Sequence, residues 1–372
     1  MRERVLLIGP YPPPDHGTSI PFKYLVDFVQ QNCDNEVFVV NTESGDKSTV
    51  RLYSPKAVRY FLLISWHILR KSRFCDIFII SGSQRFVATV GALYTVVLST
   101  LLRKQICIYI HGGAFDVYYT SMNPLFKFIV RQCLNRAKII AVQTKLVYTS
   151  LSRDFRNLVV VPNWTNVLEV SELDGANTMS DHRAIRFVYI GEVRREKGII
   201  ELIKAYQKAR HKLESSNVSV TMDIFGPTRS DFRDVFYNLL STQDNSVTYH
   251  GYLDHATLLK QLRSFDVLCL PTYFPSEGYP GVILEAMSFG LPVIATRWRA
   301  IPEIVIHEEN GLLCEPRDVE GLANCMIRIA LDDQLRRRLG ERAREVAKQF
   351  DVNVVLPRLC TLCGLKIRIP AQ

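Results

Sequence analysis

The sequence predicts two doubly wound α/β domains joined by a polar linker. The chain has 372 residues, enough for two domains of ordinary size, and its 47% hydrophobic and 22% charged residues are typical of globular proteins. Short continuous apolar runs alternate with longer helical patterns, which is typical of parallel sheets covered on both faces. This alternation stops over residues 166–184, which are polar and lack an apolar period, and then begins again.

Six apolar runs in each half predict the strands of the two sheets. In the first domain, residues 1–165, the runs are 4–9, 36–41, 76–81, 105–111, 138–143 and 158–162. In the second domain, residues 185–349, they are 185–191, 219–226, 246–252, 266–272, 291–296 and 310–316. The patterns between the runs of the first domain predict helices over 20–31, 56–71, 86–102 and 123–136. The tail, 350–372, begins with another helical pattern.

The net charge of +9 is concentrated in the first half of the chain. Residues 1–180 hold 20 Lys and Arg against 13 Asp and Glu, whereas residues 181–372 hold 26 against 24. A basic excess is compatible with a nucleic-acid surface, with an anionic membrane surface, or with solubility alone. The segment 54–74 combines basic, aromatic and aliphatic residues, so it is either an interfacial helix or an ordinary helix packed on the sheet.

Two apolar features bear on where the protein works. The N-terminal stretch MRERVLLIGPYPPP is too short in apolar residues for a signal peptide, so we expect a cytoplasmic protein. The run 86–102 is at the lower limit of a membrane span, and we expect it to be a helix buried against the sheet instead.

Cys360 and Cys363 form a CxxC pair without a second pair, which favours two thiols on an apolar helix over a zinc site.

Ligands of open parallel sheets bind beyond the carboxyl ends of the strands, and several unusual residues follow the predicted strands. Gly17 lies in a Pro-rich loop before a helix, either as an anion or sugar site or as a stiffened turn. His111 ends a strand and precedes two glycines; it is either a ligand-binding or a structural histidine. The loop 191–198 places three cations, Arg194, Arg195 and Lys197, at a helix start, where they form a diphosphate site or a solvated surface.

The stretch SEGYPGVILEAMSFGLPVIAT, residues 276–296, carries two glutamates around a small-residue turn. Gly278 and Gly281 leave backbone N–H groups accessible at the start of a helix predicted over 281–289. Glu285 lies inside this helix among apolar residues, where an unpaired carboxylate is costly. A ligand diol would match its two oxygens, and an Arg partner such as Arg297 or Arg299 is the structural alternative.

These motifs resemble the retaining GT-B glycosyltransferases, specifically the large family 4 group. Glu277 and Glu285 match its E-x7-E pattern within a nearly complete signature, SEGYPGVILEAMSFGLPVIAT. The resemblance extends along the chain through five further motifs: HG at 111–112, VPN at 161–163, EKG at 196–198, FG at 225–226 and NGLL at 310–313. It departs at Glu192, where the family usually has an Arg, so that either Arg194 or Arg195 takes over its phosphate contact or the phosphates are held differently.

The resemblance implies a GT-B fold in which the second domain holds a nucleotide-diphosphate sugar. It implies catalytic roles for His111, Glu277 and Lys197, with Lys197 neutralising the diphosphate. It also implies a set of donor-binding residues: Gly17, Arg194, Arg195, Lys197, Gly278, Tyr279, Pro280, Gly281, Val282 and Glu285. The C-terminal helix of the family usually crosses back to the first domain, and residues 350–372 are expected to do the same.

The expected activity is therefore metal-independent, retaining transfer of a sugar to a hydroxyl acceptor, with no cofactor beyond the donor. The basic first half favours a lipid-linked oligosaccharide of bacterial surface-polysaccharide synthesis as acceptor. It also favours peripheral contact with anionic lipid at the inner face of the cell membrane. A soluble-acceptor transferase and a nucleotide-sugar epimerase are the nearest alternatives. A non-catalytic nucleic-acid-binding protein is a remote one, because no helix-turn-helix or stacking-aromatic motif is present.

Overall fold

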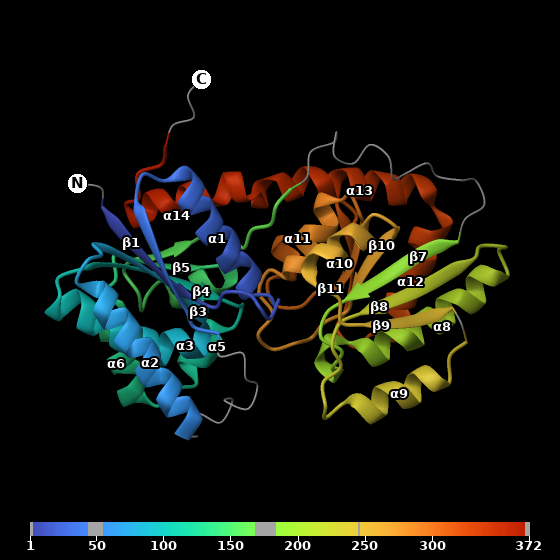
Figure 1. The fold of residues 1–372 in the computed structure, drawn as a ribbon. Helices are drawn as coiled ribbons and strands as arrows, with labels where there is room; N and C mark the ends of the chain where they lie inside the picture. Colours follow the sequence, from blue (N-terminus) through green and yellow to red (C-terminus); the bar gives the residue numbers. More distant parts are fainter. Residues whose placement is uncertain (1–2, 44–54, 168–183, 245, 369–372) are drawn as a thin grey trace. The chain divides into compact units, whose positions relative to one another are not determined.

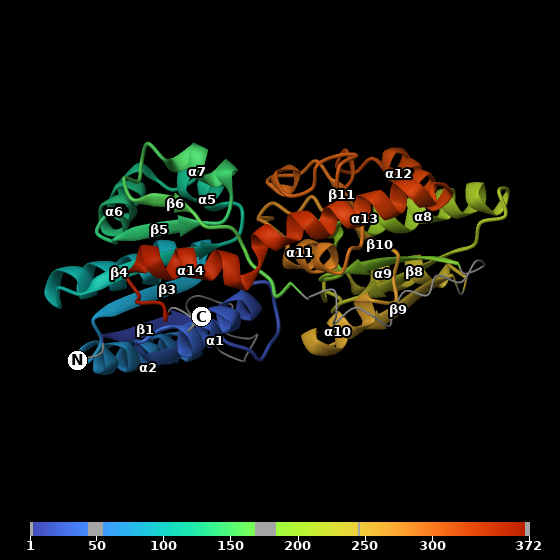
Figure 2. The same ribbon diagram turned by 90° about the horizontal axis from the view of Figure 1, so that it is seen from above.

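A computed structural model describes residues 3–43, 55–167, 184–244 and 246–368 (Figure 1). The chain forms two compact units, Met1–Trp164 with Val352–Gln372, and Thr165–Asp351. Most of the polar segment predicted as a linker lies outside the described residues. Each unit contains one parallel six-stranded sheet with helices on both faces, as the sequence predicts (Figures 1 and 2).

The sheet of the first unit has the order β2-β1-β3-β4-β5-β6, and every neighbouring pair is parallel. Its strands are β1 (Arg4–Gly9), β2 (Glu36–Asn41), β3 (Ile77–Ser83), β4 (Gln105–His111), β5 (Ile139–Val142) and β6 (Leu158–Val160). All six coincide with predicted apolar runs. The order places β1 and β3 side by side, where the direction of winding reverses and where open α/β sheets bind ligands.

Two layers of helices cover this sheet (Figures 1 and 2). The helices are α1 (Ser19–Asn32), α2 (Pro55–Ser72), a helical segment over 84–101, α5 (Phe115–Thr120), α6 (Pro124–Leu134), α7 (Lys145–Leu151) and α14 (Val352–Cys363). Helices α1 and α14 share one apolar core with one face of the sheet. Helices α2, α5 and α6 and the 84–101 segment share another core with the opposite face.

The 84–101 segment consists of alternating α-helical and π-helical turns, α3 (Gln84–Phe86), η2 (Val87–Gly91), α4 (Ala92–Val96) and η3 (Val97–Leu101). It is the one described helix long and apolar enough to cross a membrane, and 39% of it is buried in the fold. Val87, Ala88 and Leu98 of its inner face belong to the core beneath the sheet. The predicted packing against the sheet is therefore present, although Leu93 and Leu101 on its outer face are exposed.

The C-terminal helix α14 belongs to the first unit, although it follows the second unit in the chain. Leu356, Leu359 and both CxxC thiols, Cys360 and Cys363, are buried against the core that α1 also lines. Burial raises the pKa of the Cys363 thiol, so it stays protonated. The two cysteines are therefore free core residues, as the sequence predicts.

The sheet of the second unit has the order β12-β11-β10-β7-β8-β9, again with parallel neighbours. Its strands are β7 (Ile185–Ile190), β8 (Val220–Phe225), β9 (Val247–Gly251), β10 (Val267–Leu270), β11 (Val293–Thr296) and β12 (Gly311–Cys314). Its helical elements are η5 (Arg195–Lys197), α8 (Ile199–Glu214), α9 (Arg233–Ser241), α10 (His255–Leu262), α11 (Gly281–Ser288), η6 (Ile301–Glu303), α12 (Val319–Leu331), α13 (Asp333–Ala347) and η7 (Lys348–Phe350). The adjacent central strands β7 and β10 bring the loops after them to the same edge of the sheet.

Candidate functional site

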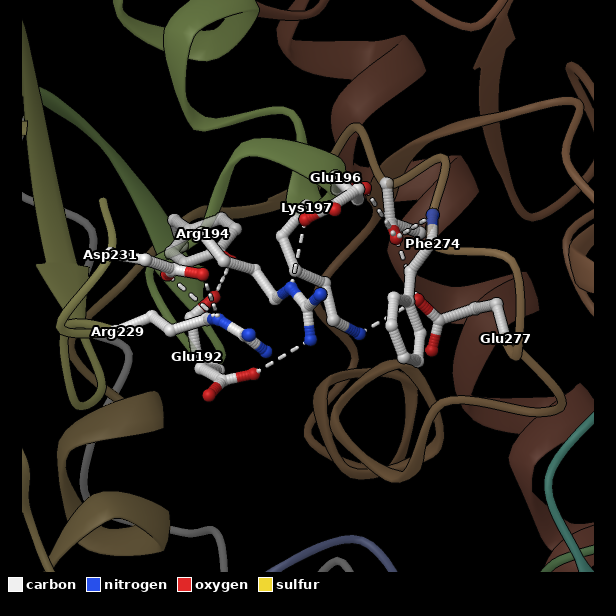
Figure 3. Close-up of polar contacts among 10 residues, drawn as sticks. Glu192, Arg194, Glu196, Lys197, Arg229, Asp231, Phe274 and Glu277 are labelled. Atoms are coloured by element: carbon white, nitrogen blue, oxygen red, sulfur yellow. Dashed lines mark hydrogen bonds and ion pairs between the residues drawn. The ribbon is translucent and has the colours of Figure 1, made fainter. Parts of the chain in front are cut away.

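The centre of the candidate site is an ion pair between the loops that follow β7 and β10. Lys197 Nζ lies 2.7 Å from Glu277 Oε2, and the two side chains are 17% and 8% exposed (Figure 3). The close approach of this loop to the end of β10 requires a glycine at position 198. Gly198 has a φ of +74°, and a Cβ there would lie 2.1 Å from the carbonyl oxygen of Pro271. The glycine of the EKG motif therefore lets the lysine approach the end of β10.

Glu277 is held on one oxygen only. Besides Lys197, Thr272 donates its hydroxyl to Glu277 Oε2 at 2.6 Å. Within the described part of the chain, Oε1 receives no hydrogen bond. An ionised carboxylate accepts up to four hydrogen bonds, so Oε1 is available to a hydroxyl donor of a ligand.

Arg194 lies beside Lys197 on a shared aromatic ring. The guanidinium of Arg194 and the ammonium of Lys197 lie 4.7 and 5.1 Å from the centroid of Phe274 (Figure 3). Arg194 also donates to Glu196 at 2.9 Å and to Glu192 at 3.3 Å. The Glu196 carboxylate is ionised, because its hydrogen bond from Arg194 holds the pKa of that carboxyl below its usual range.

The two arginines of the loop therefore differ in position. Arg195 is exposed, and its guanidinium lies over a different ring, Phe232, at 5.7 Å. A further ion pair, Arg229 with Asp231, borders the cluster on the side of Glu192 (Figure 3). Of the two candidates for the phosphate contact that Glu192 cannot make, Arg194 is the one placed next to Lys197.

The predicted helix start and its second glutamate are present at α11, which begins at Gly281. The first N–H groups of a helix have no intrahelical acceptor, which leaves those of Gly281 and Val282 for a ligand. Glu285 lies one turn further along, and its Oε1 is 2.8 Å from His255 Nε2. Because a carboxylate only accepts, Nε2 of His255 carries the proton of this bond.

The remaining predicted donor residues shape the turn before α11. Gly278, Tyr279 and Pro280 are buried, and the Tyr279 hydroxyl donates to Glu303 at 2.7 Å. Tyr279 also belongs to the apolar core of the unit. Their contribution in this structure is therefore to fix the backbone that presents Glu277 and Gly281.

His111 belongs to the first unit and is buried at the end of β4. Its Nε2 lies 2.8 Å from the Ser81 hydroxyl, and Gln143 donates to its Nδ1 at 3.4 Å. The same Gln143 accepts from the backbone N–H of Gly112. Since Nδ1 accepts, Nε2 carries the proton and donates to Ser81. Burial, and secondarily the neighbouring His16, lowers the pKa of His111 to about 3.

This burial predicts a pH-dependent stability of the first unit. Below pH 6.5 the unfolded chain takes up a proton on His111 that the folded protein excludes, so folding loses about 1.4 kcal/mol per pH unit down to pH 3. We expect His111→Gln to lose less stability than wild type between pH 7 and pH 5, by about 2 kcal/mol. Urea unfolding followed by tryptophan fluorescence measures this difference. His67→Gln, at an exposed site on α2, is the control, and equal slopes for wild type and His111→Gln would contradict the assignment.

Gly17 lies in an exposed loop before α1, where a Cβ would meet nothing within 4 Å. The preceding His16 occupies the start of the helix, because its Nδ1 accepts from the backbone N–H groups of Thr18 and Ser19. The ring also contacts Glu43 at 2.9 Å. An anion at this helix start would have to displace the His16 ring.

Sequence reasoning missed two residues of the site. His255 showed no partner pattern, yet it holds Glu285 in place of the Arg297 or Arg299 considered as the structural alternative. Thr272 orients Glu277 from the end of β10. The His255 contact has no sequence signal, because it depends on how two separate helices pack together. The Thr272 contact lies within one loop, and it depends on how that loop turns back on itself between residues 272 and 277. Among the described residues, no three His, Cys, Asp or Glu side chains form a group that would hold a metal ion.

Two parallel six-stranded sheets, each covered by helices, give this chain the GT-B fold of glycosyltransferases. HepE from Anabaena, solved in complex with UDP and glucose, shares this fold with a TM-score of 0.72. The comparison covers 98% of this chain and 100% of that chain at 16% identity.

Residues 174–346 match the family model described as Glycosyl transferases group 1. N-acetyl-alpha-D-glucosaminyl L-malate synthase from Bacillus anthracis is 31% identical over 265 residues, which cover 67% of this chain and 64% of that protein. Phosphatidyl-myo-inositol mannosyltransferase from Mycolicibacterium smegmatis is 31% identical over 125 residues, 32% of each chain. Residues 174–346, most of the second unit, carry the glycosyl transferases group 1 sequence, and the chain spans less than two thirds of the length of these two relatives.

Proposed function

We propose that this protein is a retaining, metal-independent glycosyltransferase that moves a sugar from a nucleotide-diphosphate sugar to a hydroxyl acceptor. The observation that carries the proposal is the Lys197–Glu277 pair at the carboxyl edge of the sheet, next to the open helix start of α11. A cation, a carboxylate and free N–H groups are the partners that a diphosphate and a sugar need. HepE, which shares the fold, was solved with UDP and glucose.

In the proposed reaction the bond between the anomeric carbon and the leaving phosphate oxygen breaks, and its electron pair stays on that oxygen. The acceptor oxygen attacks the same face of the sugar, and its proton passes to the leaving phosphate. Lys197, Arg194 and the N–H groups of Gly281 and Val282 stabilise the charge that develops on the diphosphate. Glu277 orients the sugar through Oε1, and Glu285 accepts from the ribose hydroxyls.

The proposed acceptor is a lipid-linked oligosaccharide of bacterial surface-polysaccharide synthesis, reached at the inner face of the cell membrane. The basic first half of the chain supports contact with anionic lipid. Phosphatidyl-myo-inositol mannosyltransferase, a relative by sequence, is by name an enzyme that glycosylates a lipid. A soluble acceptor is the second candidate, because the relative aligned over more of the chain is by name an N-acetyl-alpha-D-glucosaminyl L-malate synthase, a name that joins a sugar to a small organic acid.

The first test is thermal stabilisation by a panel of nucleoside diphosphates and nucleotide sugars. A ligand at 100 times its Kd adds about 2.7 kcal/mol to the free energy of unfolding, so one base should stand out in the panel. The absence of stabilisation by every nucleotide, in a folded sample, would overturn the donor site. The identified donor is then incubated with lipid-linked and soluble acceptors, with and without EDTA. NMR of the product gives its anomeric configuration, and conversion of the donor without an acceptor would indicate an epimerase.

A further inference from the structure

Three helices of the first unit form a continuous layer on one face of its sheet: α2, the 84–101 segment and α6 (Figures 1 and 2). The inner sides of all three belong to one core, through Ile68 of α2, Leu98 of the 84–101 segment and Leu134 of α6. A hydrogen bond of 2.6 Å between Ser65 and Tyr94 joins α2 to the middle helix. The inner sides are thus fixed by the sheet, and the outer sides face away from it.

The outer side of this layer is unusually apolar. Trp66 is 53% exposed, and the Arg70 guanidinium lies 5.2 Å from its ring centroid. Further large exposed apolar residues of the layer are Leu62, Leu63, Leu69, Leu93, Leu101, Leu125, Phe128 and Ile129. The described residues of the whole second unit expose only Val235, Tyr237, Tyr252, Ile306 and Leu331. Concentration of exposed apolar surface on one face of a protein marks an interaction site.

The charge of the same layer has one sign. The three helices contain no Asp or Glu, and their basic residues are Lys56, Arg59, Arg70, Lys71, Arg85, Lys127 and Arg131. Over residues 55–136 there are eleven Lys and Arg against two Asp, a net charge of +9 that equals the net charge of the chain. Of the two aspartates, Asp116 is buried and Asp76 lies 3.6 Å from Lys104.

We propose that the outer side of the layer formed by α2, the 84–101 segment and α6 docks on the surface of an anionic lipid bilayer. The helices lie in the plane of the membrane, with Trp66, Leu93 and Phe128 inserted among the acyl chains near the headgroups. The surrounding Arg and Lys bind the anionic headgroups. This inference rests on the membrane contact of the proposed function and assigns it to a surface.

Other occupants fit the surface less well. A second copy of the chain in a symmetric contact would bring Arg59, Arg70 and Arg85 against the same basic layer of that copy, with no acidic residue of the layer to pair with them. Nucleic acid would match the charge and leave the aliphatic residues without a partner. Spanning of the membrane by residues 84–101 would remove Val87 and Leu98 from the core under the sheet. A bilayer surface satisfies both the apolar and the basic residues while the fold stays intact.

Trp66 makes the test direct, because it is exposed in the layer, whereas Trp164 is buried and Trp298 is a partly buried residue of the second unit. The full chain is mixed with vesicles of phosphatidylcholine alone or with 30% phosphatidylglycerol, and binding is measured by co-sedimentation. We expect binding to the anionic vesicles that weakens in high salt, with a blue shift of the fluorescence and quenching by brominated lipids. Trp66→Phe should still bind but should lose the blue shift and most of the quenching.

Two variants separate the charges from the apolar contacts. Arg59→Gln/Arg70→Gln should weaken vesicle binding by about fivefold for each cation removed. Leu93→Ser/Phe128→Ser should weaken it by about tenfold or more. Val235→Ser/Tyr237→Ser, on α9 of the second unit, is the matched control and should bind like wild type, and thermal unfolding verifies that each variant is folded.

Several results would overturn this docking surface. The protein would bind neither kind of vesicle, or the α9 control would lose as much binding as the variants of the layer. Self-association through the layer in sedimentation without lipid, or tighter binding to nucleic acid than to vesicles, would also contradict it. None of these measurements uses the transfer reaction. If the protein transfers sugar but does not bind vesicles, the docking surface is wrong and the proposed enzyme activity stands. If it binds vesicles but transfers no sugar, the proposed activity is wrong and the docking surface stands.

Discussion

Replacement of Lys197 by Met should lower the rate of nucleoside diphosphate release from the donor by about 100- to 1000-fold, mainly through kcat. The ammonium is largely buried and is held between Glu277 and the Phe274 ring, so its position is fixed before the leaving group develops charge. Lys204→Met, at an exposed position on α8, changes the same charge without touching the site and should retain the wild-type rate.

The loss of Lys197 also leaves Glu277 as a buried carboxylate without its cation, which lowers stability by itself. Lys197→Met/Glu277→Gln removes that charge as well, and we expect its stability to recover while activity stays low. Recovery of activity together with stability would show that the pair is structural.

The Glu192→Gln substitution should have the opposite effect, because it removes a carboxylate that repels phosphate beside Arg194. We expect it to strengthen nucleoside diphosphate binding two- to fivefold, or about 0.5–1 kcal/mol.

The strands, and the edge of the sheet at which the candidate site lies, were predicted from local patterns in the chain. Strands buried on both faces need continuous apolar runs, and all twelve runs of that kind became strands. The site follows from topology, because parallel strands place the loops after them at one edge. The EKG motif marked Lys197 and Gly198, and the structure adds the reason, a backbone carbonyl of Pro271 where any side chain at 198 would clash.

Contacts between distant side chains were beyond local patterns. The partner of Glu285 is thirty residues away on another helix, and histidines and arginines are equally plausible partners from sequence alone. The apolar outer side of α6 was also missed, since a helix of eleven residues with several apolar positions predicts a buried face without saying which residues stay exposed. Such contacts depend on how the helices pack against one another, and local sequence patterns do not show that packing.

Glu285→Gln should weaken nucleoside diphosphate binding by about 10- to 100-fold, because a hydrogen bond to a charged group contributes about 1.5–3 kcal/mol. Its Oε1 is already occupied by His255, whereas Oε2 has no partner among the described residues, so a ribose hydroxyl has a free acceptor. The ribose is bound in both the ground state and the transition state, so KM should rise more than kcat falls. Isothermal titration with the nucleotide found in the panel measures the change, and Glu320→Gln, an exposed carboxylate on α12, is the control.

The hydrogen bond with His255 offers an alternative explanation for a loss of binding. In this alternative, Glu285 holds α10 against α11 and makes no contact with the ribose. In that case His255→Gln would weaken nucleotide binding as much as Glu285→Gln, and both would lower the melting temperature of the unliganded protein equally. If Glu285 contacts the ribose, His255→Gln keeps an amide donor for Oε1, and nucleotide affinity should fall only a few-fold. Full nucleotide affinity in a folded Glu285→Gln protein would remove Glu285 from the donor site and leave it as a structural residue between the two helices.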